Sequence, residues 1–398
     1  MDSGSSISWV AAEGGKSLPW LSANGAPAPK RVILVDDTIT ADAAYRSASQ
    51  GVALLWNGDY HGARQILTAL EHRTRPKPDT TTRPMSELFY RYRQNRSHRA
   101  RILSMILVPL GAGNAIELRR APDVRDASLA AYGRVDATSA VSLQEIVGAI
   151  GAQQWRAKGI PVAALGASVH PHYGTFFPVR SEYVDLVAAE PLGSMATAVV
   201  LTRTSGTRPV QAGLMRTAPV RTAFDIGTGT GVLAAVLARR GVERVVATDI
   251  EPRAVASARD TVLLLGFADR VEVVLADLFP DGQADLIVCN PPWIPAMAHS
   301  LLDAAVYDPG SRMLRGFLEG AVAHLSPGGE VWLVLSDFAE LVGLRTREDL
   351  LALIASAGLQ VVGSRAVPAV HARAADVTDP LHAVRAAEVT TLWRLAVA

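Results

Sequence analysis

Short apolar runs alternate with amphipathic stretches along most of this 398-residue chain, and that alternation predicts an α/β fold. Four apolar runs in the second half predict buried strands, at residues 224–226, 244–248, 271–276 and 284–289. Three more predicted strands, the last two of which fit an antiparallel pair, lie at residues 330–336, 359–366 and 388–397. The second half therefore predicts a seven-stranded, mostly parallel sheet with helices on both faces.

The first half predicts a separate α/β domain. Residues 1–30 are rich in Gly, Ser, Ala and Pro and show little periodicity, which predicts a flexible lead-in. We therefore expect three parts: this lead-in over 1–30, an N-terminal α/β substrate-recognition domain over 31–165, and a second domain over 166–398. The N-terminal domain is either a degenerate copy of the second half or an unrelated module, and the pattern leaves both open.

A glycine-rich turn joins the first predicted strand of the second half to a helix. Gly227, Gly229 and Gly231 follow the strand ending in Asp225-Ile226, and an apolar helical run begins at Val232. Glycines permit the unusual backbone angles of such a turn and leave room for a ligand against the backbone. The spacing is GxGxG and not the GxGxxG that seats a pyrophosphate, which favours a nucleoside without phosphates over NAD.

Acidic residues end the next two predicted strands. Asp249 ends the strand that follows the glycine turn and its helix, which is the position where a carboxylate holds a ribose diol. Asp277 ends the third strand and can accept a hydrogen bond from an adenine amino group, and Leu278 and Phe279 supply apolar neighbours for the ring. The glycine turn and both carboxylates therefore predict a site for an adenine nucleoside.

The fourth strand of the second half ends in Asn290-Pro291-Pro292-Trp293. The Asn290 side-chain oxygen and the Pro291 carbonyl can each accept one N–H of a planar amine or amide and so align its nitrogen lone pair. Proline has no N–H of its own, so it presents acceptors only, and the ring of Trp293 can stack on a planar group. Such a site can accelerate a reaction at the nitrogen by positioning it and by hydrogen bonds to the developing charge, so a strong general base is not required.

These motifs resemble those of class I S-adenosylmethionine-dependent methyltransferases, within them the small-domain or HemK-like group, over roughly residues 176–398. The resemblance implies a Rossmann-like sheet, S-adenosylmethionine as cofactor, and catalytic residues Asn290, Pro291, Pro292 and Trp293. It implies cofactor contacts at Asp225, Gly227, Thr228, Gly229, Gly231, Asp249, Ile250, Asp277, Leu278 and Asn290. A segment similar to one that lines the mouth of the site in that group places Tyr173, Phe177, Arg180 and Glu182 there, although the spacing of Pro178, Arg180 and Glu182 differs.

Composition bears on the compartment of the protein and on whether it binds a membrane or a metal. No apolar run approaches the length of a membrane-spanning helix, and the N-terminus lacks the basic start and long apolar stretch of a signal peptide. Cys289 is the single cysteine, which excludes an internal disulfide and a cysteine zinc cluster. We therefore expect a cytoplasmic protein with no membrane partner and no metal. His170 and His172 are interpreted as loop residues because no acidic or cysteine ligands accompany them.

Residues 73–101 are the most basic stretch of the chain. Nine lysines and arginines lie there against two acidic residues, with Phe89, Tyr90 and Tyr92 interleaved. Arginines with aromatic side chains can hold a phosphate backbone and unstacked bases. A solvated helix face whose charges pair with acids elsewhere is the alternative.

The sequence thus predicts an S-adenosylmethionine-dependent N-methyltransferase that acts on a planar nitrogen of a macromolecule. A base in RNA or DNA is favoured because it accounts for the basic stretch and the extra domain. A glutamine carboxamide in a protein, as in release-factor methyltransferases, is the first alternative. A non-catalytic S-adenosylmethionine-binding subunit is the second. The oligomeric state stays open.

Overall fold

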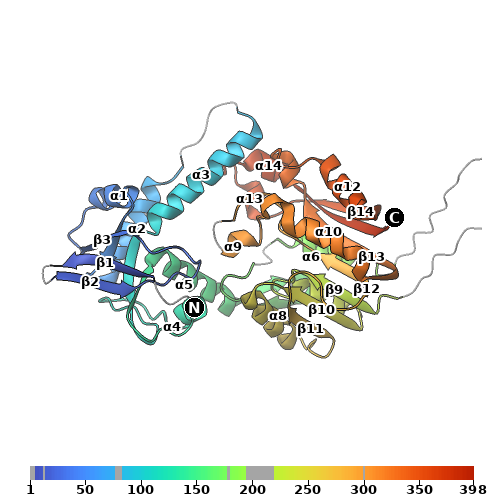
Figure 1. Cartoon of the computed structure of the whole chain (residues 1–398), viewed down its shortest axis with the longest axis horizontal. Coiled ribbons are helices and arrows are strands. Elements are labelled where there is room, and N and C mark those ends of the chain that lie inside the picture. Colours follow the sequence, from blue (N-terminus) through green and yellow to red (C-terminus); the bar gives the residue numbers. More distant parts are fainter. Residues whose placement is uncertain (1–4, 12–13, 77–82, 177–179, 194–218, 299–300) are drawn as a thin grey trace, which may run out of the picture.

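The computed structural model describes residues 5–11, 14–76, 83–176, 180–193, 219–298 and 301–398. It contains two units side by side, each built on its own sheet (Figure 1). The N-terminal unit, residues 5–158, holds a four-stranded sheet, and the C-terminal unit holds a seven-stranded sheet. No helix among the described residues is long and apolar enough to cross a lipid bilayer.

The N-terminal sheet runs in the order β3-β4-β5-β6, with only β6 antiparallel to its neighbour. Its elements are β1 (Ser6–Ala11), β2 (Gly14–Pro19), β3 (Arg31–Val35), α1 (Ala41–Ser49), β4 (Val52–Trp56), α2 (Tyr60–Arg73), α3 (Met85–Leu103), β5 (Ile106–Leu110), α4 (Arg125–Tyr132), β6 (Ser139–Ser142) and α5 (Leu143–Lys158). The strands follow one another in chain order across the sheet, whereas the first strand of the C-terminal sheet lies in its middle. The two sheets therefore differ in topology, which counts against a degenerate copy.

The predicted flexible lead-in over residues 1–30 is wrong in its described part, which forms two paired strands. β1 and β2 form an antiparallel hairpin from Ser6 to Pro19, where the sequence predicts a flexible lead-in. Ile7 is fully buried against Val32 and Leu55, so the hairpin covers one face of the sheet. Ile7 and Trp9 alternate with exposed residues, which is the two-residue period of a half-buried strand. The high Gly and Ser content concealed this short alternation.

A small hairpin links the two units. Strands β7 (Ile160–Val162) and β8 (Ala167–Val169) pair across the 3₁₀ turn η1 (Ala163–Leu165). Ile160, Val162 and Val169 pack into the core of the C-terminal unit. The predicted boundary at residue 165 cuts through this hairpin, and the described packing moves it to Gly159.

The C-terminal sheet has the order β11-β10-β9-β12-β13-β15-β14, with β15 antiparallel to both of its neighbours and the other pairs parallel. This confirms the predicted seven-stranded, mostly parallel sheet. Its elements are α6 (Glu182–Ala189), β9 (Thr222–Ile226), α7 (Val232–Arg239), β10 (Arg244–Asp249), α8 (Pro252–Leu264), β11 (Val271–Leu275), β12 (Ala284–Cys289), α9 (Leu301–Ala304), η2 (Pro309–Ser311), α10 (Arg312–His324), β13 (Leu325–Ser336), α11 (Phe338–Leu341), α12 (Arg347–Ser356), β14 (Leu359–Pro368), α13 (Ala372–Ala375), α14 (His382–Ala387) and β15 (Val389–Val397).

Helices cover both faces of this sheet. On one face α6, α7 and α8 pack in a single apolar cluster, and on the other α10 and α12 do so. Nearly all of α7 is buried, which fits its uniformly apolar sequence. Two-sided cover explains why the central strands are near-continuous apolar runs and do not alternate.

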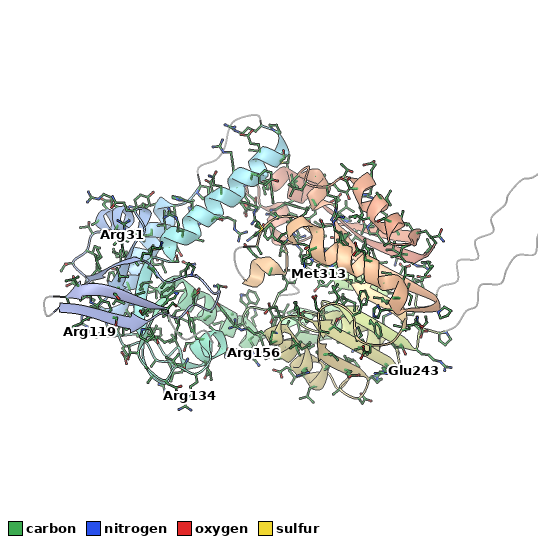
Figure 2. The ribbon with its side chains drawn as sticks, in the orientation of Figure 1. Arg31, Arg119, Arg134, Arg156, Glu243 and Met313 are labelled. Carbon is green, nitrogen blue, oxygen red and sulfur yellow. The ribbon has the colours of Figure 1, made fainter. Side chains whose placement is uncertain are left out.

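Two kinds of contact join the units. Arg156 of α5 donates to Asp260 of α8 over 3.0 Å (Figure 2). Helix α3, the long diagonal helix of Figure 1, leaves the N-terminal sheet and reaches the C-terminal unit near α14. Its Phe89 is buried in a cluster with Ile294 and Phe338. The predicted basic stretch therefore packs in part against the second unit.

Candidate active site

A buried carboxylate braces the glycine turn that follows β9. The Oδ2 atom of Asp225 accepts from the Thr228 hydroxyl at 2.6 Å and from the Ala234 backbone N–H at 2.9 Å. Burial raises the pKa of Asp225 to about 6, against the lowering effect of these two hydrogen bonds. Asp225 and Thr228 are 1% and 5% exposed. Their side chains therefore hold the turn together, and their predicted contact with the cofactor stays a prediction.

The three glycines of the turn all have positive φ, but the space around each of them differs. A Cβ on Gly231 would lie 3.0 Å from the Cα of Ala258 in α8, and one on Gly227 would lie 2.7 Å from the Cε of Met313. Met313 is near the start of α10 (Figure 2). A Cβ on Gly229 would meet no atom within 4 Å. Gly229 therefore faces open space, which fits a ligand lying against the backbone.

The other predicted cofactor residues lie near one edge of the sheet, because β11, β10, β9 and β12 are adjacent and parallel. The carboxylate of Asp249 accepts from the backbone N–H of Gly229 and of Glu251, each at 2.9 Å. Burial raises the pKa of Asp249. Leu278 adopts φ 68°, and its carbonyl accepts from the Thr248 hydroxyl. Ile250, which follows Asp249, and Asp277, which precedes Leu278, are exposed.

Trp293 folds back onto Asn290 at the end of β12. Its indole Nε1–H donates to the Oδ1 atom of Asn290 over 2.8 Å. This bond occupies one of the two lone pairs of Oδ1 and fixes the plane of the carboxamide. Asn290, Pro291 and Trp293 all line a cavity of about 470 Å³, whereas Pro292 is not part of its lining. The structure thus brings three of the four predicted catalytic residues together.

Aromatic and charged side chains from both units build the walls of this cavity. The aromatic lining consists of Phe89, Phe176, Tyr183, Trp293, Tyr307 and Phe338. The charged and titratable lining consists of Arg96, Arg180, Asp303, His371, Arg373, Arg385 and Glu388. Phe89 and Arg96 lie on α3, so the N-terminal unit contributes directly to the cavity.

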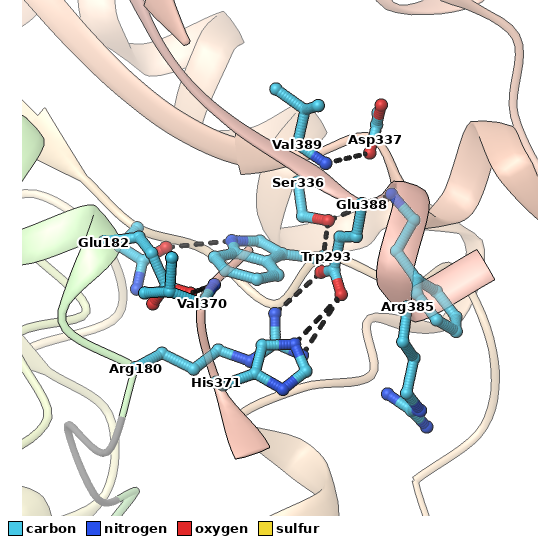
Figure 3. Close-up of polar contacts among 12 residues, drawn as sticks. Arg180, Glu182, Trp293, Ser336, Asp337, Val370, His371, Arg385, Glu388 and Val389 are labelled. Carbon is cyan, nitrogen blue, oxygen red and sulfur yellow. Dashed lines mark hydrogen bonds and ion pairs between the residues drawn. The ribbon is translucent and has the colours of Figure 1, made fainter. Parts of the chain in front are cut away.

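A buried ion pair supports the predicted catalytic turn, Asn290–Trp293 (Figure 3). The Nη1 atom of Arg180 donates to Glu388 over 2.7 Å, and its guanidinium lies 5.2 Å from the centre of the Trp293 ring. Glu388 also accepts from the Ser336 hydroxyl at 2.5 Å, and the His371 ring lies 3.4 Å away. Burial raises the pKa of Glu388, but His371 and Arg180 outweigh it and hold the value at about 2. Glu388 is therefore an ionised anchor and not a base near neutral pH.

The predicted mouth residues separate into three groups. Arg180 lines the cavity, as the sequence predicts. Tyr173 does not: it packs beside Ala127 and Ala131 of α4, 5.4 Å from the guanidinium of Arg253. Glu182 is buried behind the cavity, where it accepts from the Val370 backbone N–H over 2.7 Å. Phe177 lies outside the described residues.

Several lining residues escaped prediction. Phe338 and Glu388 lie far beyond the catalytic turn in the chain, and Phe89 lies far before it, so spacing gave no signal. An acidic residue directly before the last apolar strand was the one available hint for Glu388. Tyr307 lies in a stretch for which the sequence predicts no site residue.

The two histidines before this region have structural partners. His172 lies 2.7 Å from Asp260 through its Nε2 atom, and the Nδ1 atom of His170 lies 2.6 Å from the Arg156 carbonyl oxygen. Among the described residues no group of three His, Cys, Asp or Glu side chains could hold a metal ion. His172 therefore helps to attach α8 to the junction between the units, and His170 contacts the backbone of α5 there.

A family model described as "Methyltransferase small domain" matches residues 206–344. This part of the chain is similar to methyltransferase small domains. The family predicted from the sequence is thereby confirmed. The matched residues include the glycine turn, Asp249, Asp277 and the predicted catalytic residues Asn290–Trp293. It does not include Phe89, Arg180 or Glu388, which complete the cavity from outside the match.

Curated relatives of this domain differ in what they modify. A release factor glutamine methyltransferase from Cereibacter sphaeroides is 38% identical over 143 residues, 32% of this chain and 51% of that protein. A tRNA1(Val) (adenine(37)-N6)-methyltransferase from Tolumonas auensis is 35% identical over 140 residues, 32% of this chain and 59% of that protein. A ribosomal protein L11 methyltransferase from Pelotomaculum thermopropionicum is 46% identical over 74 residues, 18% of this chain and 24% of that protein. The chain thus spans about a quarter to three fifths of these relatives.

Proposed function

We propose that the chain is an S-adenosylmethionine-dependent N-methyltransferase acting on a planar amine or amide nitrogen. The hydrogen bond from Trp293 to Asn290, made at the wall of a cavity, carries the proposal. It orients a side-chain acceptor that has one lone pair left for a substrate N–H. The open cradle at Gly229, with Asp249 and Asp277 beside it, fits the cofactor.

The residues of the cavity account for the chemistry. When bound, S-adenosylmethionine supplies a methyl group activated by a positively charged sulfur. Asn290 Oδ1 and the Pro291 carbonyl each accept an N–H of the substrate, which aligns the nitrogen lone pair. The aligned nitrogen would be placed to accept that methyl group, and the two acceptors would hold its N–H groups until one proton is released.

The proton leaves to water under this proposal. Two carboxylates, Glu388 and Asp303, line the described part of the cavity. Glu388 is paired with Arg180 and has a pKa of about 2, and Asp303 lies 3.6 Å from Arg96. With that pKa, Glu388 is a poor general base near neutral pH, which agrees with catalysis by positioning.

The substrate we favour is a base in RNA or DNA. Six aromatic side chains line the cavity, and flat apolar walls suit a ring better than a thin glutamine side chain. The basic stretch contributes less to this argument than its composition suggests, because Arg93 and Arg96 contact the C-terminal unit. A protein glutamine is the alternative, supported by the name of the Cereibacter sphaeroides relative.

Transfer of a labelled methyl group tests the proposal. The purified chain is incubated with labelled S-adenosylmethionine and an extract of cells lacking its gene, and the products are treated with ribonuclease, deoxyribonuclease or protease. We expect label that a nuclease removes. Label that only protease removes would make the glutamine alternative correct. Cofactor binding without any transfer would overturn the enzyme proposal in favour of a non-catalytic subunit.

A further inference from the structure

Helix α3 contacts the catalytic cavity through two arginines. The guanidinium carbon of Arg93 lies 3.8 Å from the centre of the Tyr307 ring, and its Nη2 donates to the Met297 carbonyl. One turn further along, Arg96 lies 3.6 Å from the Asp303 carboxylate. Tyr307 and Asp303 both line the cavity. Helix α3 of the N-terminal unit therefore both lines the pocket, through Phe89 and Arg96, and contacts its wall at Tyr307 and Asp303.

The wall that these arginines contact, residues 303–308, is tied to the catalytic turn. The backbone of Ile294, the residue after Trp293, donates to the Val306 carbonyl at 3.1 Å, and the Ile294 carbonyl accepts from the Asp308 N–H at 2.8 Å. The Asp308 carboxylate in turn accepts from the N–H groups of Met313 and Leu314, at the start of α10. A displacement of this wall would therefore be transmitted to the catalytic turn.

We propose that Arg93 is a positioning residue for the acceptor pocket, and that the N-terminal unit sets acceptor recognition by holding Tyr307 in place. This inference rests on the proposed function. A cation over the electron-rich face of an aromatic ring attracts it, and the attraction is stronger at sites shielded from water. Arg93 is half-buried and Tyr307 is 6% exposed, so the pair is shielded. Phe89 seals the same interface, with its ring centre 6.1 Å from that of Phe338.

The test compares two arginines on the same helix. Arg93→Met removes the cation and keeps the length of the side chain. Arg101→Met removes the same charge from an exposed arginine whose described partner is His98 of the same helix. Methyl transfer is measured into a dilution series of the gene-deleted extract, cofactor affinity by calorimetry, and amide hydrogen exchange over residues 303–308 by mass spectrometry.

For Arg93→Met we expect an apparent KM for the extract about tenfold higher, roughly the effect of one shielded cation–π pair. Cofactor affinity should stay within about twofold of wild type, and residues 303–308 should exchange faster. Tyr307→Leu should reproduce this effect, and combining it with Arg93→Met should add little. Arg101→Met should match wild type.

Equal losses in Arg93→Met and Arg101→Met, both relieved at low salt, would overturn the proposal and make α3 a general electrostatic surface. Unchanged exchange at residues 303–308 in Arg93→Met would also overturn it. Hydrogen exchange does not depend on activity, so this arm still tests the contact if the wild-type chain transfers no methyl group. That last result would contradict the proposed function separately.

Discussion

The indole N–H of Trp293 donates to Asn290 Oδ1 over 2.8 Å, so the aromatic residue of the catalytic turn orients its amide. The sequence suggests that Trp293 stacks on the substrate. The structure adds that one side of its ring already meets the Arg180 guanidinium, 5.2 Å from the ring centre. Trp293 therefore links the buried Arg180–Glu388 pair to the acceptor that we assign to the substrate.

Trp293→Phe should distinguish the role of the aromatic ring from the role of the indole N–H. The variant keeps an aromatic wall but leaves the Asn290 carboxamide without its donor, so we expect kcat for methyl transfer to fall about tenfold. Cofactor affinity should not change. Trp155→Phe, at an exposed position of α5, is the matched control and should match wild type. An unchanged kcat in Trp293→Phe would show that the hydrogen bond does not orient Asn290 during turnover.

The Arg180–Glu388 pair should be strongly coupled. Glu388 is 1% exposed, so Arg180→Met leaves a buried carboxylate without its cation and should cost about 3–5 kcal/mol of unfolding free energy. The double variant Arg180→Met/Glu388→Leu should cost less than the sum of the two single changes. Denaturant unfolding of the four proteins measures this. Additive losses would contradict a direct partnership.

The lowered pKa of Glu388 predicts that the unfolding free energy depends on pH. The pKa of Glu388 falls from 4.5 to about 2 on folding, so its contribution is complete above about pH 4.5 and is lost as the pH falls toward 2. The pKa of Asp225 rises to about 6 on folding, so its effect on stability has the opposite dependence on pH. The pH dependence of the wild type alone therefore does not isolate the contribution of Glu388. The difference in unfolding free energy between wild type and Glu388→Gln should shrink by roughly 3 kcal/mol over that window. A constant difference would contradict the lowered pKa.

Two glycine substitutions should fail in different ways. Gly229→Ala places a methyl group in the open space that we assign to the cofactor, so it should weaken S-adenosylmethionine binding at least tenfold. Its positive φ should also cost about 1–2 kcal/mol of unfolding free energy. Gly231→Ala carries a similar backbone cost and also presses on Ala258 of α8, so it should lower the melting temperature more. Calorimetric titration and thermal unfolding separate the two effects. Normal cofactor affinity in folded Gly229→Ala would remove Gly229 from the cofactor site.

Local sequence signals predicted the C-terminal sheet well. The central strands β9, β10 and β12 are short, mostly apolar runs with turn residues at their ends, which is the signal that the sequence carries. The glycine turn and the catalytic turn were found because their chemistry lies in consecutive residues. Residues 194–218, which precede the first predicted strand of that sheet, lie outside the described part of the chain.

Contacts between distant parts of the chain could not be predicted in this way. The β1–β2 hairpin is stable only because Ile7 has an apolar sheet to cover, and the sequence does not state that partner. Likewise the arginines of α3 suggested a nucleic-acid surface, whereas Arg93 and Arg96 contact Tyr307 and Asp303 on a wall that belongs to the other unit. Only the three-dimensional arrangement shows which charges are already paired.

Asn290→Ala provides the most direct test of the account. Methyl transfer from labelled S-adenosylmethionine into the gene-deleted extract is compared between this variant and wild type, alongside calorimetric titration of the cofactor. The account predicts cofactor affinity within about threefold of wild type and transfer reduced at least a hundredfold, since an aligned hydrogen-bond acceptor has that order of effect on rate. Transfer near the wild-type rate in a folded, cofactor-binding Asn290→Ala protein would contradict the assignment of this cavity as the site of methylation.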